Sequence, residues 1–269
     1  MKSGFFSRPF KYLEVARIAC AGRMAFFGDF LARPLFFAVI LFVFFQLWEK
    51  VFTPDRPVVA GFSVSETLWY LVMTEAILLS TPRFDGRVDD EIKSGSIAYL
   101  LQRPCNYVWY HVFWGLGESL PIFFLNACSG GLVAYLLLGK ISFIWTGIPL
   151  VFTAVTGAMI LYIFVALCIA LLAFWIEDTT PFFWIYQKML FICGGLMIPL
   201  DFFPDWVRPI LDALPFRTIL YGPAKLFVQF SGVEAIRLLV WQGFWIFVFG
   251  GIAMGMFNLG TRKVHIHGG

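Results

Sequence analysis

Charged residues are scarce in this chain: Asp, Glu, Lys and Arg make up 14% of its 269 residues, against about 25% in an ordinary soluble domain. Hydrophobic residues reach 60%, and 33 residues are phenylalanines. The alternating pattern of a membrane β-barrel is missing. We therefore expect an all-α integral membrane protein, because helices satisfy their own backbone hydrogen bonds in lipid.

The motifs of nucleotide and metal enzymes are also missing. No GxxxxGK[ST] loop occurs; the nearest fragment, Gly139-Lys140, has Ala134 in place of the first glycine and Ile141 in place of Ser or Thr. No HExxH motif occurs, and His111 has no Asp or Glu close behind it. We expect no catalytic residue, no metal site and no bound cofactor in this chain. If the protein uses ATP, a partner subunit must therefore bind it together with Mg.

Patterned cysteines and a secretory leader are two further features that the sequence lacks. The five cysteines stand alone in apolar stretches, without metal-ligand spacing or an obvious disulfide pair. They are Cys20, Cys105, Cys128, Cys168 and Cys193. The stretch 1–33 carries scattered charges and no apolar core before a small-residue cleavage site, so we expect no cleavable signal peptide. His265 and His267 lie in a tail, where we do not expect a metal site.

Apolar runs of about 20 residues predict membrane-spanning helices. Six are predicted, at residues 34–52, 63–81, 107–138, 147–176, 181–199 and 235–259. Pro34 suits the first turn of the first span. The third run is longer than a membrane requires, so either its first turns stand in the cytosol or it bends at Pro121. Gly251 and Gly255 have the GxxxG spacing that permits close helix approach, which is weak evidence alone.

Two other segments are predicted to lie at the membrane without crossing it. Residues 8–27 predict an amphipathic interfacial helix. Its apolar side carries Tyr12, Val15, Ala16 and Ala19, and its polar side carries Lys11, Glu14 and Arg17. Residues 201–232 are apolar but contain four prolines, which forbid a straight spanning helix. A re-entrant helical segment after the fifth span is therefore expected.

Orientation follows from the distribution of Lys and Arg, which favour the cytosolic side. With a cytosolic N-terminus, twelve basic residues lie inside: Lys2, Arg8, Lys11, Arg17, Arg23, Arg33, Arg83, Arg87, Lys93, Arg103, Arg262 and Lys263. Six lie outside: Lys50, Arg56, Lys140, Arg208, Arg217 and Lys225. Lys188 and Arg237 stand near span ends and are not counted. We expect both termini in the cytosol.

The charged loop at 83–103 is the most informative cytosolic stretch. It starts acidic and ends basic, which complements a helix dipole, and its apolar residues could contact a partner. The residues of interest are Asp89, Asp90, Glu91, Ile92, Lys93, Gly95, Ser96, Ile97, Leu100 and Leu101. From these residues alone, a plain loop helix is equally compatible with the pattern.

Carboxylates inside spans are costly and mark candidate functional positions. Glu75 lies well inside the second span, Glu66 nearer its outer end, and Glu118 in the third span. They are candidates for a substrate path or for pairing across a dimer. The alternative is a polar group satisfied by a neighbouring helix. Nine residues separate Glu66 from Glu75, which predicts roughly opposite faces.

Two blocks of sequence resemble the ABC-2 type exporter permeases, also called type V exporters. The first is Glu91-Ile92-Lys93-Ser94-Gly95-Ser96 followed by Leu100-Leu101-Gln102-Arg103-Pro104. The second runs from Gly194-Gly195 through Pro199, Phe203 and Pro204 to Leu214-Pro215-Phe216. The stretch Tyr221-Gly222-Pro223-Ala224-Lys225-Leu226-Phe227 is closest to two-permease systems sometimes named viologen exporters. The resemblance covers nearly the whole chain.

The resemblance implies a function and partners. The loop at 83–103 would be the coupling helix that docks on a separate ATPase subunit, present in two copies, beside the interfacial helix. Pro199, Phe203, Pro204, Pro215 and Phe216 would form an outer gate. A second permease copy or a sister permease would complete the transporter in a bacterial inner membrane. Membrane lipid is the other expected contact, and no nucleic-acid partner is expected.

Two other classes of function remain as alternatives. An ion-driven secondary transporter would predict internal repeats and broken helices, and no motif occurs twice. A membrane enzyme would need clustered polar catalytic residues near one face, and none is evident. The substrate stays open, because the fold serves lipids, glycans, drugs and peptides and fold does not fix function.

Overall fold

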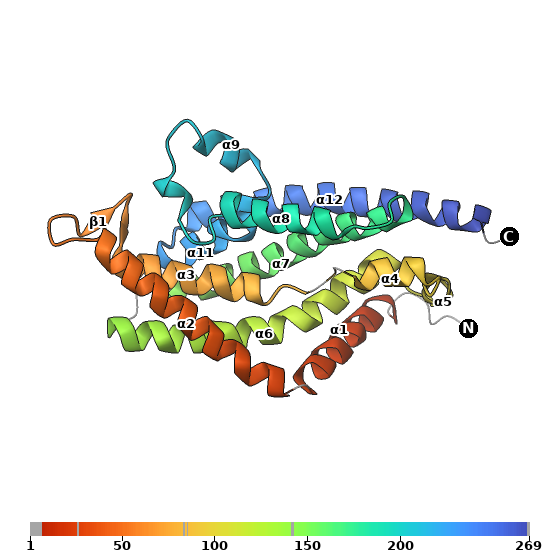
Figure 1. Cartoon of the computed structure of the whole chain (residues 1–269), viewed down its shortest axis with the longest axis horizontal. Coiled ribbons are helices and arrows are strands. Elements are labelled where there is room, and N and C mark those ends of the chain that lie inside the picture. The colour runs from red at the N-terminus through yellow and green to blue at the C-terminus, as the bar shows by residue number, and fades with distance from the viewer. Residues whose placement is uncertain (1–6, 26, 83, 85, 141–142, 268–269) are drawn as a thin grey trace.

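The chain folds into an elongated bundle of helices (Figure 1). The computed structural model describes residues 7–25, 27–82, 84, 86–140 and 143–267, and the side chains of 7–9, 27–34 and 263–267 lie outside this description. Arg83 and the side chains of His265 and His267 therefore lie outside the described residues. The mostly helical class predicted from composition is confirmed. Among the described residues, the strands are β1 (Val58–Val59) and β2 (Phe62–Ser63), which form one antiparallel hairpin.

The two ends of the bundle differ in their elements (Figure 1). The β-hairpin lies at one end, and α1, α4, α5 and the last turns of α12 lie at the other. We call these the hairpin end and the α4 end. The helices are α1 (Ser7–Ala25), α2 (Phe27–Val51), α3 (Val64–Leu79), α4 (Arg87–Lys93), α5 (Ile97–Leu101), α6 (Tyr107–Leu138), α7 (Ile148–Leu171), α8 (Thr180–Cys193), α9 (Arg208–Ala213), α10 (Phe216–Ile219), α11 (Tyr221–Val228) and α12 (Gly232–His267). Short 3-10 turns are η1 (Trp145–Gly147), η2 (Leu172–Phe174) and η3 (Leu200–Phe202).

Three helices within the described chain are long and apolar enough to cross a membrane. They are Tyr107–Leu138, Trp145–Phe174 and Gly232–Arg262. Helices α3 and α8 have 16 and 14 residues, fewer than the roughly 20 that a spanning helix needs. Helix α2 has 25 residues, but its first turns fall where side chains are not described. The structure alone therefore supports three spans, and six remains a prediction.

Several predicted boundaries move for identifiable reasons. Helix α2 starts at Phe27 and runs through Pro34, so this proline is not at its first turn. Helix α8 ends at Cys193 rather than near Pro199, because two glycines follow and Gly195 has a left-handed backbone with φ 69°, a conformation that glycine adopts easily. Helix α12 extends beyond the predicted 235–259 in both directions.

Helix α6 is capped at both ends by its own sequence. The Asn106 side chain accepts a hydrogen bond from the Trp109 amide, a typical N-cap. Gly139 ends the helix with φ 65°, the usual left-handed C-cap. Pro121 lies inside and does not divide the helix into two elements. Helix α6 therefore runs without a break from the α4 end to the hairpin end (Figure 1).

The core centres on α7, most of whose side chains are buried. Its neighbours include α12, α6, α10 and α11. Gln242 of α12 is buried and donates from Nε2 to the carbonyls of Ala154 and Thr218, both at 2.9 Å. Gly157 makes this approach possible, since a Cβ there would lie 2.6 Å from Gln242 Oε1. One amide thus joins α12, α7 and α10.

The glycine pair Gly251 and Gly255 does not serve packing within this chain. Both residues are exposed on α12, and a Cβ at either would meet nothing within 4 Å. Their face of α12 also carries exposed Val240 and Phe247. The close approach that GxxxG spacing allows is therefore not used between the described helices.

Candidate functional site

Two left-handed glycines shape the loop at the α4 end. Gly86 precedes α4 with φ 86°, and Gly95 separates α4 from α5 with φ 72°. Gly95 is exposed, and a Cβ there would meet no atom within 4 Å. The backbone turn, rather than close packing inside the chain, therefore requires glycine at this position.

The loop divides into residues that face its own core and residues that face outward. Ile97 is 1% exposed and Asp89 is buried beside Lys93, which donates to it at 2.8 Å. Ile92 and Leu100 are partly buried against the core. Ile97, one of the apolar residues expected to contact a partner, is instead covered by the chain's own core. Tyr99, which is 74% exposed, and Leu101, 40% exposed, are the apolar residues that point outward.

Helix α1 is attached to the same loop and to α6. The Tyr12 hydroxyl accepts a hydrogen bond from the Asn106 amide at 3.0 Å, and the Tyr12 ring stacks on Phe113. Lys11 Nζ donates to the Pro104 carbonyl. A Cβ at Gly117 would lie 2.2 Å from the Ala16 carbonyl oxygen. Helices α1, α4, α5 and the first turns of α6 thus form one connected unit, which we call the α4-end unit.

A polar network fastens α4 to α6 inside this unit. Glu91 Oε2 accepts from the Tyr107 hydroxyl at 2.7 Å and lies 3.3 Å from Nε2 of the buried His111. Arg87 lies 3.9 Å from Glu91 and 3.7 Å from Glu118, and its guanidinium covers the Trp114 ring at 4.5 Å. His111 therefore does face a carboxylate, but one that is distant in sequence.

The charge of Glu91 makes this attachment sensitive to acid. Burial raises the pKa of the Glu91 carboxyl, but contacts with His111 and Tyr107 and the Arg87 charge outweigh it and hold the pKa below the ordinary 4.5. A carboxyl with a lowered pKa in the folded state adds stability above its ordinary pKa and loses it as pH falls through the folded value. We expect the attachment of α4 to be constant at neutral pH and to weaken below about pH 4.

A spin label at Gln102→Cys would report this loosening as increased mobility. The Glu91→Gln variant should show at pH 7 the mobility that the parent shows only in acid, with no further change on acidification. Asp90→Asn, at an exposed neighbouring position, should keep the parental profile. If the spin label in the otherwise unchanged protein has the same mobility at pH 7 and pH 3, Glu91 does not control the attachment of α4 to α6.

The three predicted substrate-path carboxylates have different surroundings. Glu66 closes a capping box at the start of α3: Ser63 donates to its carboxylate from N and Oγ at 2.8 and 2.7 Å. Glu75 is 4% exposed and lines neither of the two cavities described below. Of the three, Glu118 is the one that lines either of these two cavities. Glu66 is therefore a helix-capping residue, and its role in a substrate path stays a prediction.

A cavity of about 770 Å³ lies next to the α4-end unit. Its walls come from α1, the end of α3, α4, α6, α7 and α8. Its charged residues, among those that the structure describes, are Arg23, Arg87, Glu118 and Lys188. We call it the α4-end cavity. No sequence pattern places these four residues together, since they come from four different helices.

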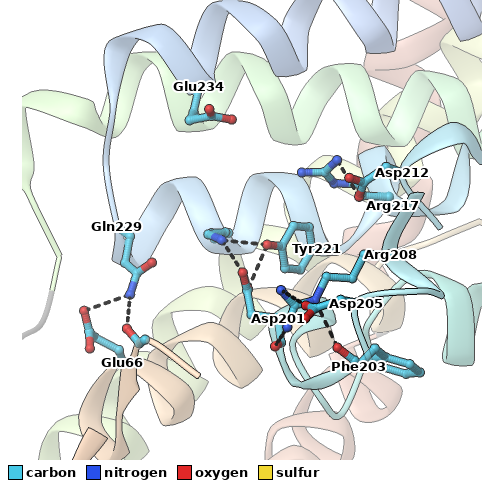
Figure 2. A network of polar contacts seen from close by, with 12 residues as sticks. Glu66, Asp201, Phe203, Asp205, Arg208, Asp212, Arg217, Tyr221, Gln229 and Glu234 are labelled. Carbon is cyan, nitrogen blue, oxygen red and sulfur yellow. Dashed lines mark hydrogen bonds and ion pairs between the residues drawn. The ribbon is translucent and has the colours of Figure 1, made fainter. Parts of the chain in front are cut away.

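The segment between α8 and α12 is bound to α3 and to itself by polar contacts (Figure 2). Asp201 accepts from the Tyr221 hydroxyl at 2.8 Å and from Lys225 Nζ at 2.6 Å. Arg208 donates to the carbonyls of Asp201 and Phe203 at 2.6 and 3.0 Å. The Tyr70 hydroxyl of α3 donates to the Gly195 carbonyl. These contacts hold the segment at the hairpin end of α3.

Gln229 joins this segment to the hairpin (Figure 2). Its Nε2 donates to the Gly61 carbonyl at 2.8 Å and to Glu66 Oε1 at 3.3 Å. A second cavity of about 360 Å³ lies here, lined by Asp201, Arg217 and Lys225 among others. The hairpin, α3 and the segment therefore form one polar assembly.

The predicted outer-gate residues occupy this segment but have unequal exposure. Pro199 and Pro215 are buried, Phe203 and Phe216 are half-buried, and Pro204 is exposed. Their gating role stays a prediction. Sequence reasoning missed Asp201, Tyr221 and Lys225, for which the only local signal is the i, i+4 spacing of the last two on one helix face.

No group of three or more His, Cys, Asp or Glu side chains in the described part of the chain could hold a metal ion. What the described residues offer is an exposed apolar surface at α5, a charged cavity beside it, and a polar assembly at the other end.

Comparison with known proteins gives one family. The family model described as "ABC-2 family transporter protein" matches residues 35–268, well over half of the chain. The comparison with curated proteins gives no significant match.

Proposed function

Since the chain belongs to the ABC-2 transporter family, we propose that it is the permease subunit of an ATP-binding-cassette exporter. It moves a substrate out of the cytoplasm with ATP that a separate subunit hydrolyses. The observation that carries this proposal is the α4-end unit, in which an exposed apolar surface at Tyr99 and Leu101 is joined by Glu91 and Arg87 to the long helix α6.

Motion of an ATPase docked on α5 would reach the spans by two routes. The first runs from Glu91 of α4 to Tyr107 and His111 of α6. The second runs through α1, which touches α6 at Gly117 and the end of the loop at Pro104. Both routes end on α6, which supports a role for this helix as the element that the ATPase moves.

The proposal extends to the remaining features of the assembly. We propose six spans, with α2, α3 and α8 adding to the three long helices, and a re-entrant segment at 201–232. Two ATPase subunits would bind two permeases, either two copies of this chain or one copy and a sister chain. The exposed face of α12 with Gly251 and Gly255 is available for such a neighbour. The location would be a bacterial inner membrane.

Co-purification tests the energy source. The chain, isolated from its native membrane in mild detergent, should carry with it a protein that contains a GxxxxGK[ST] loop. The complex should hydrolyse ATP, and the chain stripped of that protein should not, because it has no phosphate-binding loop of this kind. Hydrolysis that survives removal of every co-purified ATPase, or transport driven by an ion gradient without ATP, would exclude the proposal.

Cysteine labelling tests the orientation. Ser94→Cys, at the α4 end, and Pro57→Cys, in the loop before the hairpin, lie at exposed positions at opposite ends. The excess of basic residues on the α4 side predicts that this end is cytosolic. In intact cells an impermeant maleimide should therefore react with position 57 and spare position 94. Labelling of position 94 from outside would invert the topology and remove the basis for docking at α5.

A further inference from the structure

The α4-end cavity has a charge pattern that suits one class of ligand. Its volume, about 770 Å³, lies in the range of small-molecule sites. Three described basic side chains line it, Arg23, Arg87 and Lys188, against one described carboxylate, Glu118. The three basic residues belong to α1, α4 and α8, so the positive charge comes from three different helices.

Two of these cations have no acidic partner among the described residues. Arg87 is engaged with Glu118 and Glu91 at 3.7 and 3.9 Å. No described carboxylate lies within ion-pair distance of Arg23 or of Lys188. Cations at an apolar boundary are stabilised when an anion lies between them, and Arg and Lys are the usual side chains for phosphate and carboxylate groups.

The rest of the wall is mixed, since Ser80, Thr81, Tyr162 and Gln187 line it together with apolar residues. Phe84, Ile122, Phe183 and Phe191 line the cavity beside the charged groups. The helix that carries Lys188 also has large apolar side chains pointing away from the bundle, with Trp184 68% and Ile185 61% exposed. A helix with such an outer face suits contact with lipid. The cavity therefore combines a positive end, an aromatic wall and a helix that borders the bilayer.

We propose that the α4-end cavity binds an anionic amphiphile, with its acidic headgroup between Arg23 and Lys188 and its apolar part against Phe84, Phe183 and Phe191. The proposal rests on the proposed function and names the substrate class of that transporter. A cationic amphiphile is disfavoured, because the described carboxylate in the cavity, Glu118, is already paired with Arg87. The anion could come from the inner leaflet as a lipid headgroup or from the cytosol as a soluble amphiphile.

Binding to the purified full-length chain in phosphatidylcholine nanodiscs tests the charge preference. The probes are radiolabelled dodecyl phosphate and radiolabelled dodecyltrimethylammonium, with protein-free nanodiscs as the blank. We expect saturable binding of the phosphate and only blank-level binding of the ammonium compound. Equal binding of the two probes, or saturable binding of the cation alone, would overturn the proposal.

Substitutions test the residues. Arg23→Gln and Lys188→Gln should each weaken dodecyl phosphate binding about fivefold, and the double variant about twentyfold or more, as expected for loss of charge-assisted contacts at a partly exposed site. Arg23→Lys and Lys188→Arg keep the charge and should keep most of the affinity. Arg262→Gln, an exposed basic residue of α12 outside the cavity, is the matched control. Parental affinity in the double variant would overturn the proposal.

A competition arm separates the two sources. Phosphatidylglycerol is added to the nanodiscs as a competitor. If it displaces dodecyl phosphate, the natural ligand is a lipid headgroup; if dodecyl phosphate binding is unaffected, the natural ligand is a soluble amphiphile. Either outcome supports an anionic ligand. The binding assay contains no ATPase. A negative binding result therefore does not bear on the proposed transporter function, which the co-purification experiment tests separately. A chain that binds dodecyl phosphate but never associates with an ATPase would retain the site and lose the transporter assignment.

Discussion

A permease carrying Tyr99→Asp and Leu101→Asp is expected to fold and insert normally, yet to lose its ATPase and stop transporting. Both side chains point outward from α5, so their replacement costs the isolated chain little. Apolar and aromatic anchors at an interface each contribute about 2 kcal/mol or more. Loss of both should weaken ATPase binding several hundredfold. The measurement is ATPase recovery on the tagged permease, with ATP-driven transport in parallel.

Two controls separate docking from folding. Val58→Asp, at an exposed apolar residue of the hairpin, should leave ATPase recovery unchanged. Ile97→Asp should instead lower the amount of folded permease, because it places a carboxylate in the core beside α4. Full ATPase recovery and parental transport in the Tyr99 and Leu101 double variant would show that α5 is only a connection between two helices.

Gly117→Ala is expected to displace α1 from α6 although it adds a single methyl group. The new Cβ would lie 2.2 Å from a backbone oxygen of Ala16, so no side-chain rotation can relieve the contact. Overpacking of this kind typically costs about 1 to 3 kcal/mol. We expect a lower thermal midpoint in detergent and transport reduced about tenfold or more, because one of the two routes onto α6 is lost.

Cross-linking can detect the displacement directly. In a background without the five native cysteines, Tyr12→Cys and Phe113→Cys replace two rings whose centroids lie 5.4 Å apart and should join readily through a short bifunctional reagent. Gly117→Ala should reduce that yield strongly. Gly131→Ala is the matched control in the same helix, because its Cβ would meet Trp69 at an ordinary 3.5 Å. Parental cross-linking in Gly117→Ala would contradict the close α1–α6 packing.

Local signals in the sequence predict some of these features and could have predicted others. The apolar run that begins after Asn106 and ends at Gly139 corresponds to α6, because both ends carry capping residues. The Ser63-Glu66 capping box has a recognisable spacing, and attention to it would have shown that Glu66 closes a helix end. The early end of α8 at Gly194-Gly195 could be anticipated from the same chemistry.

Other features have no local signal. Helix α5 has five residues, little more than one turn, so periodicity could not tell that Ile97 faces inward and Tyr99 outward. The contacts of Glu91 with His111 and of Asp201 with Tyr221 each join residues 20 positions apart, and they depend on how helices pack. The same is true of the α4-end cavity, whose charges come from four helices.

The uninterrupted course of α6 has a mechanical consequence. Its 32 residues give a length of about 48 Å, and the contacts of Tyr107, Gly117 and Glu118 with α4 and α1 lie within its first four turns. A rigid helix of this length acts as a lever. A tilt of about 5° at the attached end displaces the far end by about 4 Å, given the length that follows from the rise per residue of an α-helix. A small rotation at the α4 end therefore becomes a displacement wider than a water molecule at the hairpin end, without any helix having to unwind.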